Sequence, residues 1–178
     1  MNHTLSDKIK KLNTIMTENK ATDEDIKSVR ELIGRYPDGM HATVKHNKRI
    51  ITVVSNTIIR KKPFPTLFWL VDRSATKKIS AIESTGLIKE LEKDTEIISL
   101  MKKDNEIYAG LRSFYHEQNN LPLTADSPFY NTIYKTGAGG LQDHGRIRCL
   151  HLHMAYHYSV GSSFGEYLTQ RFPDLRLQ

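Results

Sequence analysis

The chain has 178 residues and a formal net charge of +6, and it is 38% hydrophobic and 26% charged. This length and mix suit one globular domain that buries a core without disulfides or metal ions. The single cysteine, Cys149, excludes an intrachain disulfide and fits a reducing compartment. No window approaches the roughly 20 apolar residues of a membrane span, and the N-terminus lacks the apolar run of a signal peptide. We therefore expect a cytoplasmic protein.

The charge is a modest bias, with 26 Lys and Arg residues against 20 acidic ones. A basic surface favours anionic partners, which include a phosphate-containing small molecule, nucleic acid and acidic protein. Scattered lysines that keep the protein in solution are the alternative explanation.

Two amphipathic helices are expected before any strand. Apolar positions spaced four, three and four apart predict the first helix over Leu5–Met16. Thr22, followed three residues later by Asp25, has the pattern of an N-cap that starts the second helix. We therefore divide the chain into an N-terminal helical extension, residues 1–20, and one domain, residues 21–178.

The most strand-like part of the sequence follows. His41–His46 and the β-branched run Arg49–Ile59 predict a hairpin that turns at Asn47-Lys48. Leu67–Val71 predicts a third, fully buried strand. The expected fold is α+β, with a small antiparallel sheet of three or four strands packed against several helices.

The rest of the sequence is mainly helical. Ser74–Glu83 predicts a helix with Ser74 as its N-cap, and a long helical tract follows over 87–118, with a break near Asp94. A final major helix is expected over 145–158, and a short tail helix over 164–172.

Several short motifs occur in a characteristic order along the chain. In chain order they are Gly34–Gly39, Pro63–Leu70, Ile82–Gly86, Asn105–Tyr108, Gly139-Gly140, Arg146–Arg148 and Cys149–His151. In this combination the chain resembles the bacterial family of unknown function 501 over residues 34–165. The resemblance marks Cys149 and His151 but implies no activity. The chain has Tyr156 where family members often carry a histidine.

Reactive side chains are concentrated near the C-terminus. The candidate metal ligands are Cys149, His151, His153 and His157. On a helix, Cys149, His153 and His157 would form one stripe at four-residue spacing, with His151 on another face. Such a stripe could hold a divalent ion such as zinc or iron, with Glu83 or Asp143 as a fourth ligand. A packed core helix with hydrogen-bonded imidazoles is the alternative.

The candidate catalytic residues are Cys149, His151 and Glu83. A helix N-terminus and nearby arginines would lower the pKa of the Cys149 thiol, as a nucleophile requires. A buried, inert cysteine is the alternative. Glu83 is a candidate acid or base, or else a partner for a cation.

A second candidate site would bind an anion. Its predicted residues are Arg60, Lys61, Lys62, Gly139, Gly140, Arg146 and Arg148. Glycines before a helix N-terminus let backbone N–H groups approach a phosphate, and the cations would add charge. A flexible glycine connector and a solvated basic loop are the alternatives.

The sequence specifies no reaction, and whether the protein is an enzyme stays open. The leading hypothesis is a protein that binds a phosphate-containing ligand or nucleic acid through the glycine, arginine and Cys-Leu-His segments. A metal-dependent hydrolase is the second hypothesis, and a non-catalytic interaction module that docks through its N-terminal helices is the third. The first two require the late helix, the glycine segment and the proline-rich loop to share one pocket.

Overall fold

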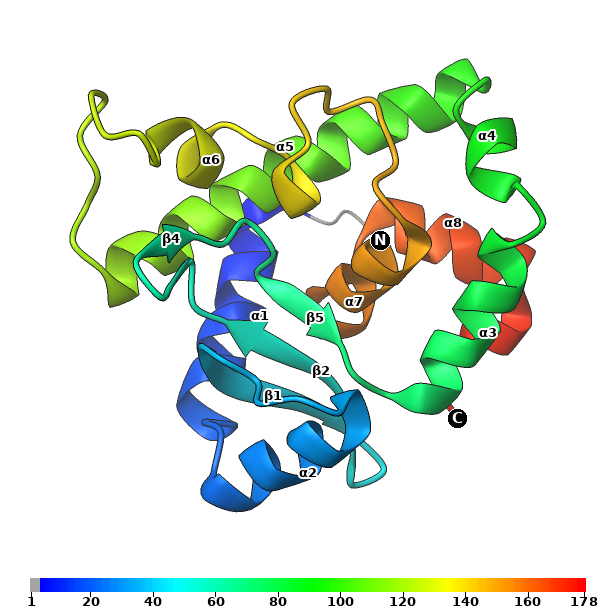
Figure 1. The fold of residues 1–178 in the computed structure, drawn as a ribbon. Coiled ribbons are helices and arrows are strands. Elements are labelled where there is room, and N and C mark those ends of the chain that lie inside the picture. The colour runs from blue at the N-terminus through cyan, green and yellow to red at the C-terminus, as the bar shows by residue number, and fades with distance from the viewer. Residues whose placement is uncertain (1–3) are drawn as a thin grey trace.

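The computed structural model describes residues 4–178, so the first three residues of the predicted extension lie outside the described residues. The helices are α1 (Leu5–Glu18), α2 (Asp23–Ile33), α3 (Arg73–Glu83), α4 (Leu87–Leu91), α5 (Thr95–Asn119), α6 (Tyr130–Tyr134), α7 (Leu150–Val160) and α8 (Ser163–Arg171), with 3₁₀ turns η1 (Ala138–Gly140) and η2 (Pro173–Leu175). The strands are β1 (Met40–His46), β2 (Arg49–Ser55), β3 (Ile58–Ile59), β4 (Lys62–Pro63) and β5 (Phe68–Leu70). Figure 1 shows these helices around a small sheet, which confirms the predicted α+β fold. None of the helices in the described part is long and apolar enough to cross a membrane.

The main sheet has the antiparallel order β1-β2-β5, with β2 in the centre. Asn47 and Lys48 both have positive φ and form the predicted two-residue turn of the β1–β2 hairpin. The predicted second strand is too long, because it ends at Ser55. The chain then makes a separate two-stranded hairpin, β3–β4, which turns at Arg60 and Lys61, also with positive φ.

Helices cover both faces of this sheet. On one face, Val29 of α2 packs with Ile50 and Val53 of β2 and with Val71 in a small core of its own. On the other face, α7 packs against β5 and β2, and α1 packs against β1 (Figure 1). The main core lies on that second face, between the sheet and α1, α5 and α7.

Helix α1 is packed into the molecule. Leu12 and Ile15 are buried in the main core, and the buried Lys8 donates a hydrogen bond to the carbonyl of Gly161, at the end of α7. The division of the chain into an extension and a domain stays a prediction. The apolar face of α1 is nevertheless covered by the rest of this chain.

Local capping determines where two of the helices begin. Thr22 accepts a hydrogen bond from the N–H of Asp25 in the predicted capping box, and Asp94 caps α5 after the predicted break. The prediction that Ser74 caps α3 is wrong. Asp72 is the cap, and its Oδ1 accepts from the N–H of Ala75 at 2.8 Å.

The predicted start of α7 is also wrong. The helix begins at Leu150, and Cys149 before it has an extended backbone with φ −164° and ψ 154°. The side chain of Cys149 does not cap the helix. The backbone from Gly145 to Arg148 is instead an irregular segment, so the basic residues there precede the helix.

A buried arginine holds the loops beside the sheet. Arg112 of α5 is fully buried, and its guanidinium donates to the carbonyls of Ile133 at 2.8 Å, Gly137 at 3.0 Å and Pro65 at 3.2 Å, and also to that of Thr136. These carbonyls belong to the end of α6, the segment before η1 and the proline-rich loop. One side chain therefore fixes three segments that are far apart in the sequence.

Candidate functional site

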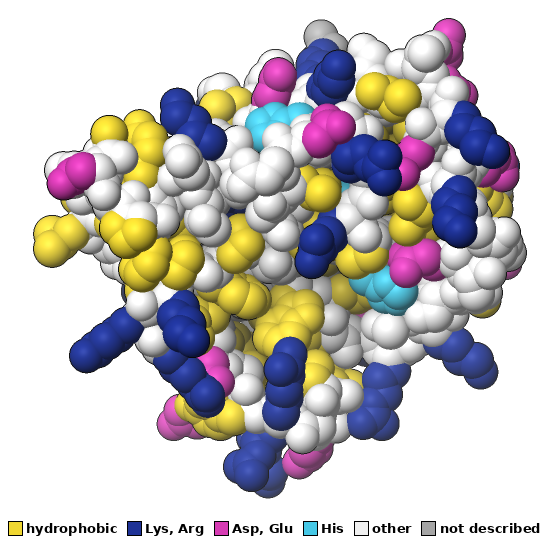
Figure 2. Space-filling view, turned by 45° about the horizontal axis from the view of Figure 1, so that its top comes forward, with side chains coloured by type: hydrophobic (Ala, Val, Ile, Leu, Met, Phe, Trp, Pro, Cys, Tyr) yellow, Lys and Arg dark blue, Asp and Glu magenta, His cyan; other side chains and the backbone are white. Residues whose placement is uncertain are grey.

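A cavity of about 440 Å³ lies beside the edge strand β5. Its walls come from the proline-rich loop, β5, α3, η1 and the start of α7. The lining residues are Thr66, Phe68, Trp69, Leu70, Thr76, Gly139, Arg148, Cys149, His151 and Leu152. The glycine segment, the late helix and the proline-rich loop thus share one pocket, as the sequence hypothesis required. Figure 2 shows a face where hydrophobic side chains gather in a hollow ringed by Lys and Arg, with a histidine beside an acidic side chain.

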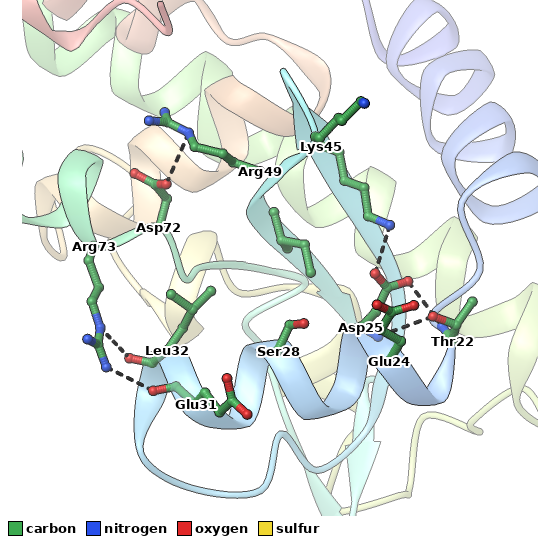
Figure 3. Close-up of a pocket in the computed structure, with 12 residues that line it drawn as sticks. Thr22, Glu24, Asp25, Ser28, Glu31, Leu32, Lys45, Arg49, Asp72 and Arg73 are labelled. Atoms are coloured by element: carbon green, nitrogen blue, oxygen red, sulfur yellow. Dashed lines mark hydrogen bonds and ion pairs between the residues drawn. The ribbon is translucent and has the colours of Figure 1, made fainter.

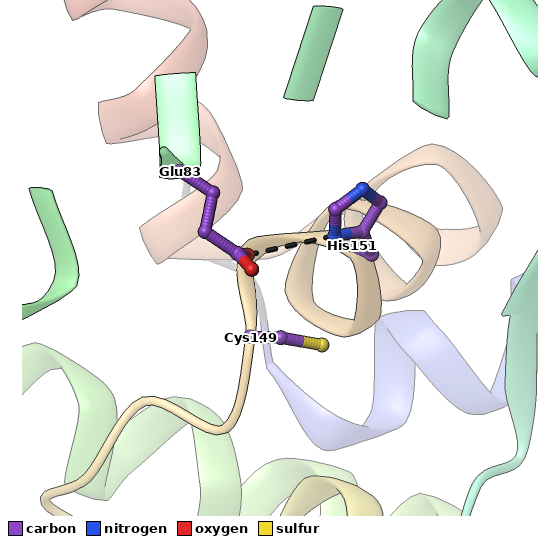
Figure 4. A group of neighbouring side chains, drawn as sticks. All are labelled: Glu83, Cys149 and His151. Atoms are coloured by element: carbon purple, nitrogen blue, oxygen red, sulfur yellow. Dashed lines mark ion pairs between the residues drawn. The ribbon is translucent and has the colours of Figure 1, made fainter. Parts of the chain in front are cut away.

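Glu83, the last residue of α3, reaches across to the start of α7. Its Oε2 accepts a hydrogen bond from the N–H of Leu150 at 2.6 Å and lies 3.5 Å from Nδ1 of His151 (Figure 4). A carboxylate at a helix N-terminus satisfies a free N–H group and interacts favourably with the helix dipole. The cap that α7 lacks locally is therefore supplied by another helix.

Glu83, Cys149 and His151 form the one group of three or more potential metal ligands that the described residues 4–178 bring together. Their ligand atoms all lie within 4.8 Å of one another, and each residue is half-buried. The predicted stripe of Cys149, His153 and His157 is wrong, because Cys149 precedes the helix and does not follow its periodicity. Because the backbone at Cys149 is extended, its side chain lies near that of His151, although regular helical spacing would have placed the two on different faces.

The other two candidate histidines lie elsewhere. His153 is buried in the core with its ring edge-on to Phe164 at 5.4 Å, and its Nε2 has no hydrogen-bond partner. Burial lowers the pKa of His153 to about 4, so the imidazole is neutral at physiological pH. His157 lies against the backbone of Ser162 at the α7–α8 junction. Neither histidine contributes to the group around Glu83.

The Cys149 thiol is not activated as a nucleophile. Burial has the largest effect and raises its pKa. The N–H of Leu152 opposes this effect, the charge of Glu83 adds to it, and the N–H of His151 and the charge of Arg148 lower the pKa by smaller amounts. Nε2 of His151 lies 3.0 Å from the Ser80 hydroxyl, so only Nδ1 faces Glu83. A relay in which one ring nitrogen contacts the thiol and the other contacts the carboxylate is therefore not formed.

The predicted basic residues separate into different environments. Arg148 is exposed at the cavity, and no residue within 4–178 forms an ion pair or hydrogen bond with its guanidinium. Arg146 pairs with Glu92 at 3.0 Å, and Arg60 pairs with Asp38 at 2.6 Å. Arg60 and Lys61 form the β3–β4 turn and Lys62 begins β4; all three are exposed and do not line the cavity. Only Arg148 of the predicted cations does so.

The glycine segment is a wall rather than an anion cradle. Gly137 and Gly140 donate their N–H groups to carbonyls in or next to the segment, and Ala138 donates to Oδ1 of Asn105 at 2.9 Å. The segment forms η1 and does not lead directly into a helix. Gly139 has φ +64°, and a Cβ there would meet the cavity-lining side chains of Leu152 and Arg148.

A second hollow, of about 760 Å³, lies between α2, the β1–β2 turn and the start of α3 (Figure 3). Five of the eight charged side chains that line it are engaged with other groups. Lys45 pairs with Asp25 at 2.7 Å, Arg49 lies 3.7 Å from Asp72, and Arg73 donates to carbonyls at the end of α2. Because these charges already have partners, the smaller cavity beside β5 is the better candidate site.

These features define an α+β protein with a partly apolar cavity and a mixed carboxylate, thiol and imidazole group at its rim. The chain belongs to the family DUF501, described as a protein of unknown function, whose model matches residues 40–166. No curated protein and no solved structure matches the chain. The matched segment contains Glu83 and every residue of the cavity beside β5 but excludes α1 and α2.

Proposed function

We propose that the protein binds a small ligand with a phosphate or similar anionic group in the cavity beside β5. The observation that carries this proposal is Arg148, a cation without a partner in the described chain, at a cavity that is otherwise mostly apolar. A guanidinium binds phosphate through two parallel hydrogen bonds, and that geometry gives orientation as well as affinity.

The walls favour a ligand with a flat or apolar portion. Phe68, Trp69, Leu70 and Leu152 line the cavity and would contact that portion. The volume of about 440 Å³ lies in the range of small-molecule sites, roughly 300–1,000 Å³. Nucleic acid is the less favoured partner, because its binding depends on many phosphate contacts and the cavity offers one predicted cation.

Two features bear on the alternatives. A metal-dependent hydrolase is supported by the grouping of Glu83, Cys149 and His151. A docking module is less well supported, because Leu12 and Ile15 of α1 are already buried in the core of this chain. A cytoplasmic location would keep the Cys149 thiol reduced, as metal binding by that thiol requires.

The binding proposal can be tested by calorimetric titration of the full-length, untagged protein. Phenyl phosphate is the probe, and inorganic phosphate and phenol serve as its two halves. We expect phenyl phosphate to bind more tightly than either half, and Arg148→Ala to weaken its binding about tenfold or more, because a charge-assisted hydrogen bond contributes about 1.5–3 kcal/mol.

Arg60→Ala is the matched control. It removes an exposed arginine that already pairs with Asp38 outside the cavity, so it should leave phenyl phosphate binding unchanged. Equal affinity of Arg148→Ala and the unmodified protein would refute the proposal. Arg148-dependent binding of a single-stranded oligonucleotide, without binding of phenyl phosphate, would replace the small ligand with nucleic acid.

A further inference from the structure

We infer that Glu83, Cys149 and His151 form a binding site for one divalent transition-metal ion of the zinc type. The three side chains offer one oxygen, one sulfur and one nitrogen ligand, all within 4.8 Å of one another. Thiolate and imidazole ligands select zinc-like ions over magnesium or calcium, which prefer oxygen alone. The site goes beyond the proposed anion binding and does not depend on it.

The distances are compatible with coordination after a small adjustment. Ligand atoms about 2.0–2.3 Å from a tetrahedral ion lie roughly 3.3–3.8 Å apart. The Glu83 oxygen and Nδ1 of His151 are already 3.5 Å apart. The remaining separations, at most 4.8 Å, need to shorten by about 1 Å, which rotation of the half-buried Cys149 side chain can provide.

The surroundings hold the ligands in place. Nε2 of His151 is hydrogen-bonded to the Ser80 hydroxyl at 3.0 Å, so Nδ1 is directed toward Glu83. Metal-binding histidines commonly bond through their second ring nitrogen in this way, which fixes the orientation of the ring. Oε2 of Glu83 also accepts the hydrogen bond from the N–H of Leu150, which holds it in place, and a carboxylate oxygen with one hydrogen bond keeps a lone pair for an ion.

The position of the group also leaves room for an exchangeable ligand. Cys149 and His151 both line the cavity beside β5, while Glu83 reaches the group from α3 (Figure 4). Three protein ligands beside an accessible cavity match zinc sites that keep a fourth position for water or substrate. Purely structural zinc sites are instead closed by four protein ligands.

The test is cobalt titration of full-length, untagged protein that has been stripped of metal with a chelator. Cobalt reports its own coordination, because thiolate ligation gives a near-ultraviolet charge-transfer band and tetrahedral geometry gives intense visible bands. We expect one cobalt ion per chain with both signals, and displacement of cobalt by zinc. No phosphate compound is present, so failure of this test is distinct from failure of the anion-binding proposal.

Variants identify the ligands. Cys149→Ser should abolish the charge-transfer band, and His151→Ala should weaken cobalt binding by about 100-fold. Glu83→Gln should weaken it by about tenfold or more, while its amide oxygen still caps Leu150 and preserves folding of the metal-free protein. A control, His157→Ala, removes a histidine from the same helix and should bind cobalt like the unmodified chain.

Two results would overturn the inference. One is the absence of a thiolate-to-cobalt band in the folded, unmodified protein. The other is an unchanged band and affinity in Cys149→Ser, which would show that cobalt binds somewhere else in the chain.

Discussion

Replacing His153 with leucine should make the free energy of unfolding less dependent on pH in the acid range. His153 is buried with Nε2 unpartnered, and burial lowers its pKa from 6.5 to about 4. Between these values the unfolded chain binds a proton that the folded chain excludes, so the free energy of unfolding falls as the pH falls from 6.5 toward 4. A pKa lowered to about 4 corresponds to about 3 kcal/mol at the acid end, and to about 2 kcal/mol between pH 7 and pH 5.

Urea denaturation at pH 7 and pH 5, with a metal chelator present, measures this contribution. The unmodified protein should lose about 2 kcal/mol more than His153→Leu between the two pH values. His41 and His116, whose pKa values burial also lowers, are present in both proteins, so their effects cancel in the comparison. Parallel losses of stability in the two proteins would refute the view that His153 is a neutral core residue.

Two further predictions concern packing, and both are read by thermal or urea unfolding. Arg112→Met should lower the free energy of unfolding by about 3 kcal/mol or more, because buried carbonyls lose their donor; an unchanged stability would contradict this role. Gly165→Ala should lower the free energy of unfolding by about 3 kcal/mol, because the added Cβ would collide with His157. In Gly110→Ala the added Cβ meets only the flexible end of Leu5, so the free energy of unfolding should change by no more than about 1 kcal/mol. Similar costs for the two alanine variants would show that α8 can move away from α7.

Local chemistry explains the parts of the fold that could be predicted from the sequence. The β1–β2 hairpin follows from β-branched residues around Asn47 and Lys48, and α2 starts where the Thr22 capping box places it. The start of α7 could not be predicted in this way, because Cys149 offers no cap and the carboxylate of Glu83 comes from 67 residues earlier in the chain. A contact of that range leaves no local signal.

The same limit applies to the candidate site. The sequence indicated Cys149, His151 and Glu83 individually, and it predicted that the late helix with Cys149 and His151 would share a pocket with the glycine and proline-rich segments. The predicted combination of ligands was wrong, because it placed Cys149 on the helix. Cys149 precedes the helix, and its backbone is extended. The prediction also grouped Arg60 with Arg148 on the basis of charge alone, although Asp38 already neutralises Arg60.

Because Glu83 and Leu150 meet at the rim of the cavity, binding of a ligand at this rim should depend on folding of the whole chain. The carboxylate of one helix and the N–H of another meet there only in the folded chain, so an occupant that needs both binds the native state alone. Such an occupant at 100 times its dissociation constant would add about 2.7 kcal/mol to the free energy of unfolding. A melting-temperature screen of metal ions and small phosphate esters could therefore find the physiological ligand before any reaction is known.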